Sequence, residues 1–195
     1  GEKRTSTLQD VADSTRVADG LDEIAFLWGP MVSGQDVPEV SRGLWELLAC
    51  FRNTGKHIQP ETLIDAASVE VAVEMAQLIT GGRDELRARP IFSVSQCAAD
   101  PLGHDGGSLD AALVSAKYGI PVGFMPMPIM CATGPATMAG NLVVYNVDTL
   151  SALVLIQLAY PGAPYFFSSA PTAMDLRTGG YTGGGMPGYE GMMGI

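Results

Sequence analysis

Reactive side chains gather in one segment near the middle of the chain. Residues 97–105 hold a thiol, two carboxylates and an imidazole, the groups that serve nucleophilic and acid–base steps. These groups are Cys97, Asp100, His104 and Asp105. His104 could contact a substrate there, although a solvated loop histidine is the commoner case. Neither His104 nor His57 has the HxH or HxxxH spacing of a metal site, so we expect no metal.

Several classes of chemistry are excluded by composition. A net charge of -10 with only 11 Lys and Arg argues against nucleic-acid binding, which needs a concentrated basic surface. The glycine-rich run 179–185 lacks the Lys-Ser/Thr of a phosphate loop. Cys50, Cys97 and Cys131 stand far apart and form no CxxC pair, and one would be left over from any disulfide. We expect a protein of the reducing cytoplasm.

Residues 125–137 form the most distinctive segment. Pro126, Pro128 and Pro135, with a Thr-Gly-Pro turn at 133–135, restrict the backbone to an extended path. A rigid segment of this kind holds ligands well. The alternative is a tight connection between a strand and a helix that binds nothing, and composition alone does not decide between the two.

These segments must be positioned by alternating strands and helices. Short apolar runs predict strands, and the segments between them have helical periodicity or helix-end signals such as Pro38, Pro60 and Gly119. The expected strands are 24–28, 56–59, 91–96, 121–127 and 165–168, and the expected helices are 8–21, 40–51, 60–80, 109–118 with Ser108 as cap, and 135–160. This alternation is typical of an α/β protein with a parallel sheet.

The alternation fits either a doubly wound sheet or a closed (βα)8 barrel of the TIM type. No GxGxxG follows the first strand, so we favour the barrel. Such a barrel takes roughly 250 residues, and five strands do not close it, so we expect a partial barrel of four to five βα units completed by residues outside the chain. We divide this single domain into a lead-in helix (1–22), βα units (23–170) and a glycine-rich tail (171–195).

No secretion signal opens the chain, and we expect no membrane association. Residues 139–160 are long and apolar enough to suggest a membrane span, but polar residues interrupt the run throughout. They are Asn141, Asn146, Asp148 and Gln157. We therefore predict a buried helix of a soluble protein.

Four motifs together resemble the trimethylamine methyltransferase family of corrinoid-dependent enzymes. They are the loop 125–137, Pro-Gly-Ala-Pro at 161–164, Met-Asp-Leu-Arg-Thr-Gly at 174–179, and Gly-Gly at 81–82 with Leu-Arg at 86–87. The resemblance covers nearly the whole chain and is strongest from 90 to 180. Two features depart from the family: its members commonly have Gly where Cys131 stands, and 186–191 does not match their alanine-rich helix.

The resemblance implies a (βα)8 barrel that moves a methyl group from a methylated amine to the cobalt of a separate corrinoid protein. The chain would bind no cofactor directly, and its partners would be the amine and the cognate corrinoid protein. Pyrrolysine, which some members carry, would lie downstream of Ile195, so we assign no catalytic residue within the chain. An amine of this kind needs aromatic faces and apolar walls, because a quaternary ammonium offers no hydrogen-bonding group.

Our first hypothesis is methyl transfer from trimethylamine, the opening step of methylamine metabolism or methanogenesis. We expect Gln96, Met127, Thr133, Ser168 and Tyr165 to contact the substrate, and His104, Pro128, Cys131 and Pro171 to lie in loops that meet the corrinoid protein. One alternative is a quaternary amine such as a betaine. A second is a non-catalytic binding module whose open strand edges recruit a partner, with self-association through 139–160. A barrel acting on a small acid or sugar would need carboxylate pairs or basic clusters at strand ends, which we do not find.

Overall fold

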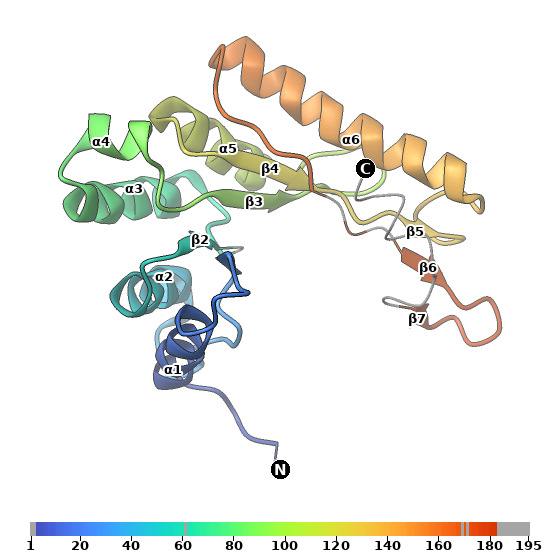
Figure 1. The fold of residues 1–195 in the computed structure, drawn as a ribbon. Coiled ribbons are helices and arrows are strands. Elements are labelled where there is room, and N and C mark those ends of the chain that lie inside the picture. Colours follow the sequence, from blue (N-terminus) through green and yellow to red (C-terminus); the bar gives the residue numbers. More distant parts are fainter. Residues whose placement is uncertain (1–2, 61, 169, 171, 183–195) are drawn as a thin grey trace.

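The computed structural model describes residues 3–60, 62–168, 170 and 172–182, and Figure 1 shows their arrangement. The elements in chain order are α1 (Leu8–Asp19), β1 (Phe26–Trp28), the 3-10 turn η1 (Glu39–Ser41), α2 (Arg42–Asn53), β2 (His57–Gln59), α3 (Ala66–Thr80), α4 (Arg83–Ala88), β3 (Val94–Cys97), α5 (Gly106–Tyr118), β4 (Val122–Met125), β5 (Ile129–Met130), α6 (Met138–Ala159), β6 (Thr172–Met174) and β7 (Tyr181–Thr182). The predicted alternation of strands and helices is therefore confirmed.

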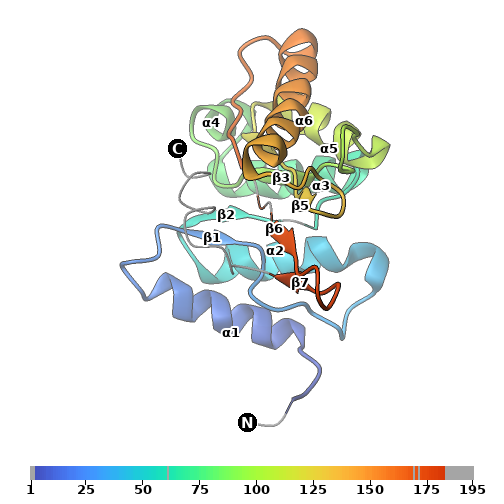
Figure 2. The ribbon, with the colours of Figure 1, turned by 90° about the vertical axis from the view of Figure 1, so that its right-hand side faces the viewer.

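Neighbouring strands in space are also neighbours in sequence. β1 pairs with β2 and β3 pairs with β4, both in parallel. A parallel bridge from Ile58 to Phe92 joins β2 to the residues before β3, and another joins Val122 to Tyr165. β5 and β6 are parallel, and β7 adds to β6 in antiparallel fashion. The fold is thus a mixed α/β structure with short parallel strands, and the described strands do not form a closed barrel (Figure 2).

Local sequence signals explain where the helices begin and end. Thr7 and Asp10 form a capping box at the start of α1. Asp65 caps α3 in the same way, and Gly81 ends that helix with a left-handed φ of 96°. α5 is capped by the Asp105 side chain, which accepts from the backbone N–H of Ser108; the prediction that Ser108 is the cap is wrong, because Asp105 is the residue in extended conformation.

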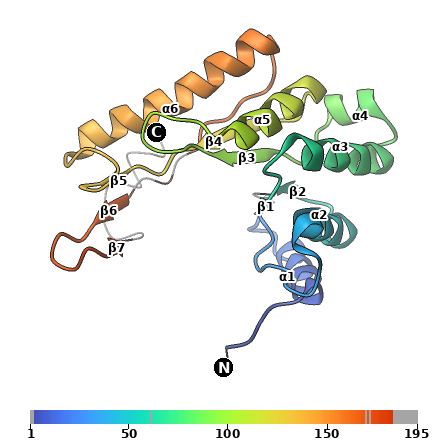
Figure 3. The same cartoon turned by 180° about the vertical axis from the view of Figure 1, so that it is seen from behind.

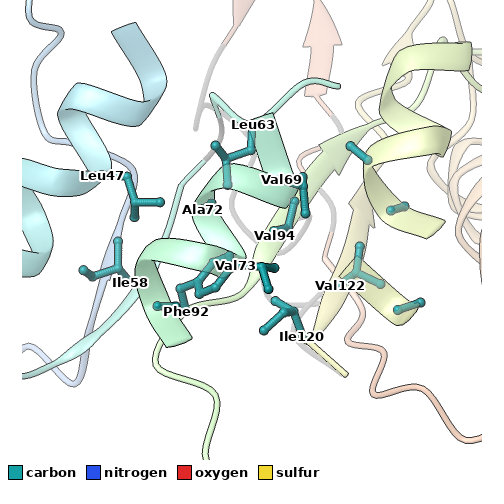
Figure 4. Packing of buried hydrophobic residues seen from close by; sticks show 14 of the residues in the cluster. Leu47, Ile58, Leu63, Val69, Ala72, Val73, Phe92, Val94, Ile120 and Val122 are labelled. Carbon is teal, nitrogen blue, oxygen red and sulfur yellow. The ribbon is translucent and has the colours of Figure 1, made fainter. Parts of the chain in front are cut away.

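The core lies between the strands and the helices that cover one of their faces. Figure 4 shows Phe92 and Val94 from the strand segments beside α3 residues, with Ile58 beside Leu47 of α2 and Val122 near Ile120. α3 contributes the small side chains Ala72 and Ala76 together with valines. In Figure 3, α3, α5 and α6 follow one another along the strands, so each covers its own stretch of the sheet.

Three predicted helix and strand details are wrong. α3 begins at Ala66 rather than at Pro60, and its large apolar residues Val71 and Leu78 are exposed while alanines and valines are buried. The helix predicted to be buried, α6, buries only Asn141, Asp148, Thr149, Ala152 and Ile156 of its 22 residues. Of the strand predicted at 165–168, only the single bridge at Tyr165 forms.

α6 is long and apolar enough to cross a membrane by length and composition alone. Its buried residues nevertheless include Asn141, Asp148 and Thr149, and the helix packs against β4. Buried polar side chains on the packed face of α6 can form hydrogen bonds with the neighbouring loops, which satisfies them in the folded protein.

Candidate functional site at the carboxyl ends of the strands

Side chains of the strands divide between two faces. Ile58, Phe92, Val94 and Val122 belong to the core on the helix side. Because successive strand residues point to opposite faces, their neighbours face away from the helices. These neighbours are Phe26 and Trp28 in β1, His57 and Gln59 in β2, Ser93, Ser95 and Cys97 in or just before β3, and Gly123 and Met125 in β4. Apart from Met125, this second face is therefore polar, aromatic or small rather than branched and apolar.

At the carboxyl ends of the strands, this second face presents a solvent-exposed aromatic side chain. Trp28 is 50% exposed and lies beside Gln59 in the register of β1 and β2. Cys97 lies beside Met125 at the ends of β3 and β4. The carboxyl ends of parallel strands are where α/β proteins bind ligands, so we define these four residues as the rim.

Further toward the amino ends, His57 takes part in a polar network on the same face. Its Nε2 lies 2.9 Å from Ser93 Oγ, and Ser93 donates to Gln59 Oε1 at 3.4 Å. Burial lowers the pKa of His57, and a hydrogen bond to the backbone of Pro90 opposes that shift. The imidazole is accordingly held in its neutral form at pH 7.

The β3–α5 loop brings a histidine against α6. His104 Nε2 lies 2.8 Å from Ser151 Oγ, and the Ser151 hydroxyl donates to the Asp148 carbonyl at 2.9 Å. Since that hydroxyl has only one proton, His104 Nε2 must be the donor of the first bond. Burial lowers the pKa of His104, against the opposing charge of Asp148, and its ring meets Phe124 edge-on at 4.9 Å.

The same loop holds the segment that follows β4. Asp100 Oδ2 accepts a short hydrogen bond from the backbone N–H of Met127. Burial raises the pKa of Asp100 to about 6; the Met127 bond lowers it, and the neighbouring Asp148 side chain raises it further. Asp100, His104, Asp148 and Ser151, which we call the carboxylate–histidine cluster, therefore join the β3–α5 loop to α6.

Hydrogen bonds within the segment 126–137 fold it back on itself. Thr133 Oγ1 accepts from the Ile129 N–H at 2.9 Å, and the buried Asn141 amide donates to the Pro128 carbonyl at 2.9 Å. Cys131 has a left-handed φ of 68°, a conformation that favours glycine. A glycine at this position would adopt the same φ without strain.

The predicted substrate residues do not converge on one point among the described residues. Gln96 is buried and donates to the Leu63 carbonyl at 2.7 Å, and the Tyr165 hydroxyl donates to the Thr149 carbonyl at 3.0 Å, both on the helix side. Met127 and Thr133 are exposed, and Ser168 donates to the Phe124 carbonyl at 3.1 Å. Their roles as substrate contacts stay predictions.

The residues predicted to meet a corrinoid protein are spread in the same way. His104 belongs to the carboxylate–histidine cluster, Pro128 is buried, and Cys131 is half-buried. Pro171 lies outside the described residues. Sequence reasoning missed Asp148 and Ser151, although an acidic residue in the middle of an apolar helix is itself a signal that a partner must lie close by.

One pocket lies at the opposite ends of the strands, and the described residues form no metal site. A pocket of about 580 Å³, lined among others by Lys56, His57 and Arg89, lies at the amino ends of β2 and β3, opposite to the rim. Within 3–60, 62–168, 170 and 172–182, no three His, Cys, Asp or Glu side chains come together as a metal site would require.

Comparison with known proteins identifies the family. The sequence model of the trimethylamine methyltransferase (MTTB) family matches residues 1–195. The chain belongs to the trimethylamine methyltransferase family. It is 34% identical over 176 residues to trimethylamine methyltransferase MttB of Desulfitobacterium hafniense and 32% identical over 176 residues to that of Methanosarcina barkeri, covering 90% and 89% of this chain.

A second kind of relative is also similar. The glycine betaine methyltransferase of another strain of Desulfitobacterium hafniense is 28% identical over 179 residues, or 92% of this chain. The aligned part is only 35% of each of the two trimethylamine methyltransferases and 37% of the glycine betaine methyltransferase, so the chain spans about a third of the length of these relatives.

Proposed function

We propose that the protein transfers a methyl group from trimethylamine to the cobalt of a cognate corrinoid protein. The observation that carries this proposal is the family match over the whole chain, with relatives named trimethylamine methyltransferase at 34% and 32% identity. In this reaction one N–CH3 bond of the trimethylammonium ion breaks, the methyl group leaves without the bonding electrons to be accepted by the cobalt nucleophile, and dimethylamine leaves as the neutral amine, keeping those electrons and the proton that the ammonium ion carried. Methylamine metabolism or methanogenesis would begin with this step.

A (βα)8 barrel is the fold that we propose for the complete protein. The bridges and ladders run from β1 through β2, β3 and β4 to Tyr165 in sequence order, with every pairing parallel. A doubly wound sheet reverses its strand order at a switch point, whereas a barrel keeps sequence order around its circumference. The described strands show no such reversal, which favours the barrel.

The rim has features that suit a methylated ammonium ion. Trp28 offers an exposed indole face, and such faces attract quaternary and tertiary ammonium ions by cation–π interaction. Met127, 39% exposed and two residues beyond the rim residue Met125, adds apolar surface. An open rim also suits a corrinoid that a partner protein carries, which when bound would supply the nucleophile that accepts the methyl group. The chain would then bind the amine and no cofactor of its own.

A quaternary amine is the second candidate substrate, because the similar glycine betaine methyltransferase covers 92% of this chain. The two substrates differ in a carboxylate and in the proton that trimethylammonium carries. Purified full-length protein, given its reduced corrinoid protein, should consume trimethylamine and alter the cobalt absorption spectrum. Turnover with glycine betaine alone would move the assignment to the second candidate, and no spectral change with either amine would refute methyl transfer.

Trp28→Leu tests the rim within the same assay. Loss of a cation–π contact of about 0.5–2 kcal/mol predicts a rise in the amine KM of roughly 2- to 30-fold. Trp45→Leu is the matched control, since Trp45 is 44% exposed but lies on α2 beside α1, away from the strand ends. Equal KM values for the two variants would exclude Trp28 from amine binding.

We also propose a cytoplasmic location and a homo-oligomer. Among the described residues no disulfide joins the three cysteines, which fits a reducing compartment. The exposed apolar residues of α6, among them Val143, Val154 and Leu158, fit a surface covered by a second copy. Light scattering of the full-length protein at micromolar concentration tests the oligomer, and a monomer would contradict it.

A further inference from the structure

Three buried polar atoms lack hydrogen-bond partners where the β3–α5 loop meets α6. They are Asp100 Oδ1, His104 Nδ1 and Asp148 Oδ2, and none has a partner among the described residues. Asp148 interacts with both of the others, so the three atoms belong to one site. A buried polar atom without a partner is costly, which means that something must satisfy this group.

A shared proton accounts for the two carboxyl groups of this site. The side chain of Asp148 lies close enough to that of Asp100 for a hydrogen bond to form once one of the two carries a proton. Two ionised carboxylates are both acceptors, so a hydrogen bond between them requires that one carries a proton and donates it to the other. Asp148 is 1% exposed and Asp100 is half-buried, and repulsion between two negative charges at contact further favours keeping that proton.

No other charge near the pair replaces the proton. The ion pairs among the described residues are Arg4–Asp10 and Arg16–Asp13, both on or beside α1. His104 also lies close to Asp148, and burial favours the neutral form of its imidazole. The described residues also offer no metal site, so a metal does not account for the contact.

The pair is connected directly to the rim. Asp100 uses Oδ2 to accept from the Met127 N–H, and Met127 stands in the segment that leaves β4 at its carboxyl end. Asp148 stands behind Asp100 on α6, a helix anchored against β4. The position of Met127 therefore depends on where the Asp100 carboxyl lies, and that depends on Asp148.

We propose that Asp100 and Asp148 are positioning residues of the amine site, a carboxyl pair that shares one proton under mildly acidic conditions and in that state fixes the Met127 segment at the rim. The link to the amine rests on the proposed function, whereas the shared proton and the placement of Met127 do not. Nothing in this proposal gives either carboxyl a contact with the substrate.

The pair makes the rim sensitive to pH. Burial and Asp148 raise the pKa of Asp100 to about 6, above its ordinary 3.8, so the folded protein keeps the proton at acidic pH and loses it as pH rises through about 6. Above that pH the two carboxylates repel each other across their contact. Asp100 then moves, and the Met127 N–H that it holds moves with it.

The test follows the Met127 methyl group in the full-length protein by nuclear magnetic resonance, with 13C-methyl methionine and with Met127→Leu to assign the signal. In the unaltered protein the Met127 signal should shift between about pH 4.5 and 7.5 with a midpoint near 6. Asp148→Asn removes the ionisable neighbour but keeps its shape, and the midpoint should fall by roughly one pH unit or more. Asp105→Asn is the control, because the Asp105 side chain caps α5. In this variant the midpoint of the Met127 titration should match that of the unaltered protein.

Two results would overturn the proposal: a Met127 signal that does not titrate in this range, or an unchanged midpoint in Asp148→Asn. Neither readout requires catalysis. A protein that fails to transfer methyl groups can therefore still show the titration expected of the carboxyl pair, and a protein without that titration can still transfer methyl groups. If the amine site is at the rim, the amine KM of the active protein should change with the same midpoint, and that change should shift in Asp148→Asn as the Met127 signal does.

Discussion

Gly134 in the Thr-Gly-Pro turn should be intolerant of a side chain for a reason that the sequence alone does not show. A Cβ on Gly134 would overlap Asn141 Oδ1 and lie 3.2 Å from the Pro128 side chain. Asn141 is fully buried, and its amide donates to the Pro128 carbonyl at 2.9 Å. Gly134→Ala must therefore displace the Asn141 amide and break that bond.

The expected cost has two parts. A buried carbonyl left without its donor costs about 1–3 kcal/mol, and overpacking a tight site costs about 1–3 kcal/mol. Because displacement of Asn141 relieves part of the overlap, the two do not add fully, and we expect Gly134→Ala to lower the free energy of unfolding by about 2–3 kcal/mol. Urea unfolding followed by circular dichroism measures it.

A double-mutant cycle separates this cause from others. In an Asn141→Ala background the overlap is gone, so Gly134→Ala should cost far less than it does alone. Gly55→Ala is the matched control, because no atom lies within 4 Å of a Cβ there, and it should stay within about 0.5 kcal/mol of the unaltered protein. Equal costs for Gly134→Ala in both backgrounds would refute the role of Asn141.

Two other substitutions test single contacts at the site. Cys131→Gly should stabilise the protein by about 0.5–1 kcal/mol. Relief of the left-handed φ gains about 1–2 kcal/mol, and the greater conformational entropy of glycine in the unfolded chain offsets about 0.5–1 kcal/mol of that gain. Cys131→Ala keeps the strain and should show no such gain in urea unfolding; destabilisation by the glycine would contradict the reasoning. Tyr165→Phe should cost about 1 kcal/mol at neutral pH, since it removes the bond to the Thr149 carbonyl. Burial raises the pKa of Tyr165 to about 12 from 10.0, so its contribution is lost only as pH rises through about 12, and a cost that varies between about pH 6 and 8 would count against this assignment.

The order of the elements could be predicted from the sequence because its signals are local. Gly81 and Gly119 do end their helices in the left-handed conformation, as short-range chemistry requires. The buried face of α3 could not be predicted in the same way. Close packing on the core favours small side chains such as Ala72 and Ala76, while Leu78 faces outward, so ranking residues by hydrophobicity selects the wrong face.

Strand faces were equally hard to predict. In β3 the residues Val94, Ser95 and Gln96 are all buried, so polarity does not alternate and gives no sign of which side chains face the core. Gln96 was expected at the barrel mouth, but its amide bonds to the Leu63 carbonyl on the helix side. Only the register of the strands against the core distinguishes the two faces, and register depends on contacts distant in sequence.

The apolar composition of α6 does not show that the helix holds the neighbouring segments through polar groups. Its exposed residues are mostly apolar, yet the loops at the carboxyl ends are held by the buried polar groups that interrupt the apolar run. Asn141 holds the Pro128 carbonyl, Asp148 meets Asp100, and the Thr149 carbonyl accepts from Tyr165. Two successive loops after strands, and the bridge residue Tyr165, thus depend on one helix. Substitutions at these polar positions should therefore disturb the rim more than substitutions at the exposed leucines and valines of α6. A hydrogen bond to a loop fixes the position of that loop, whereas the exposed apolar side chains hold no other segment in place among the described residues.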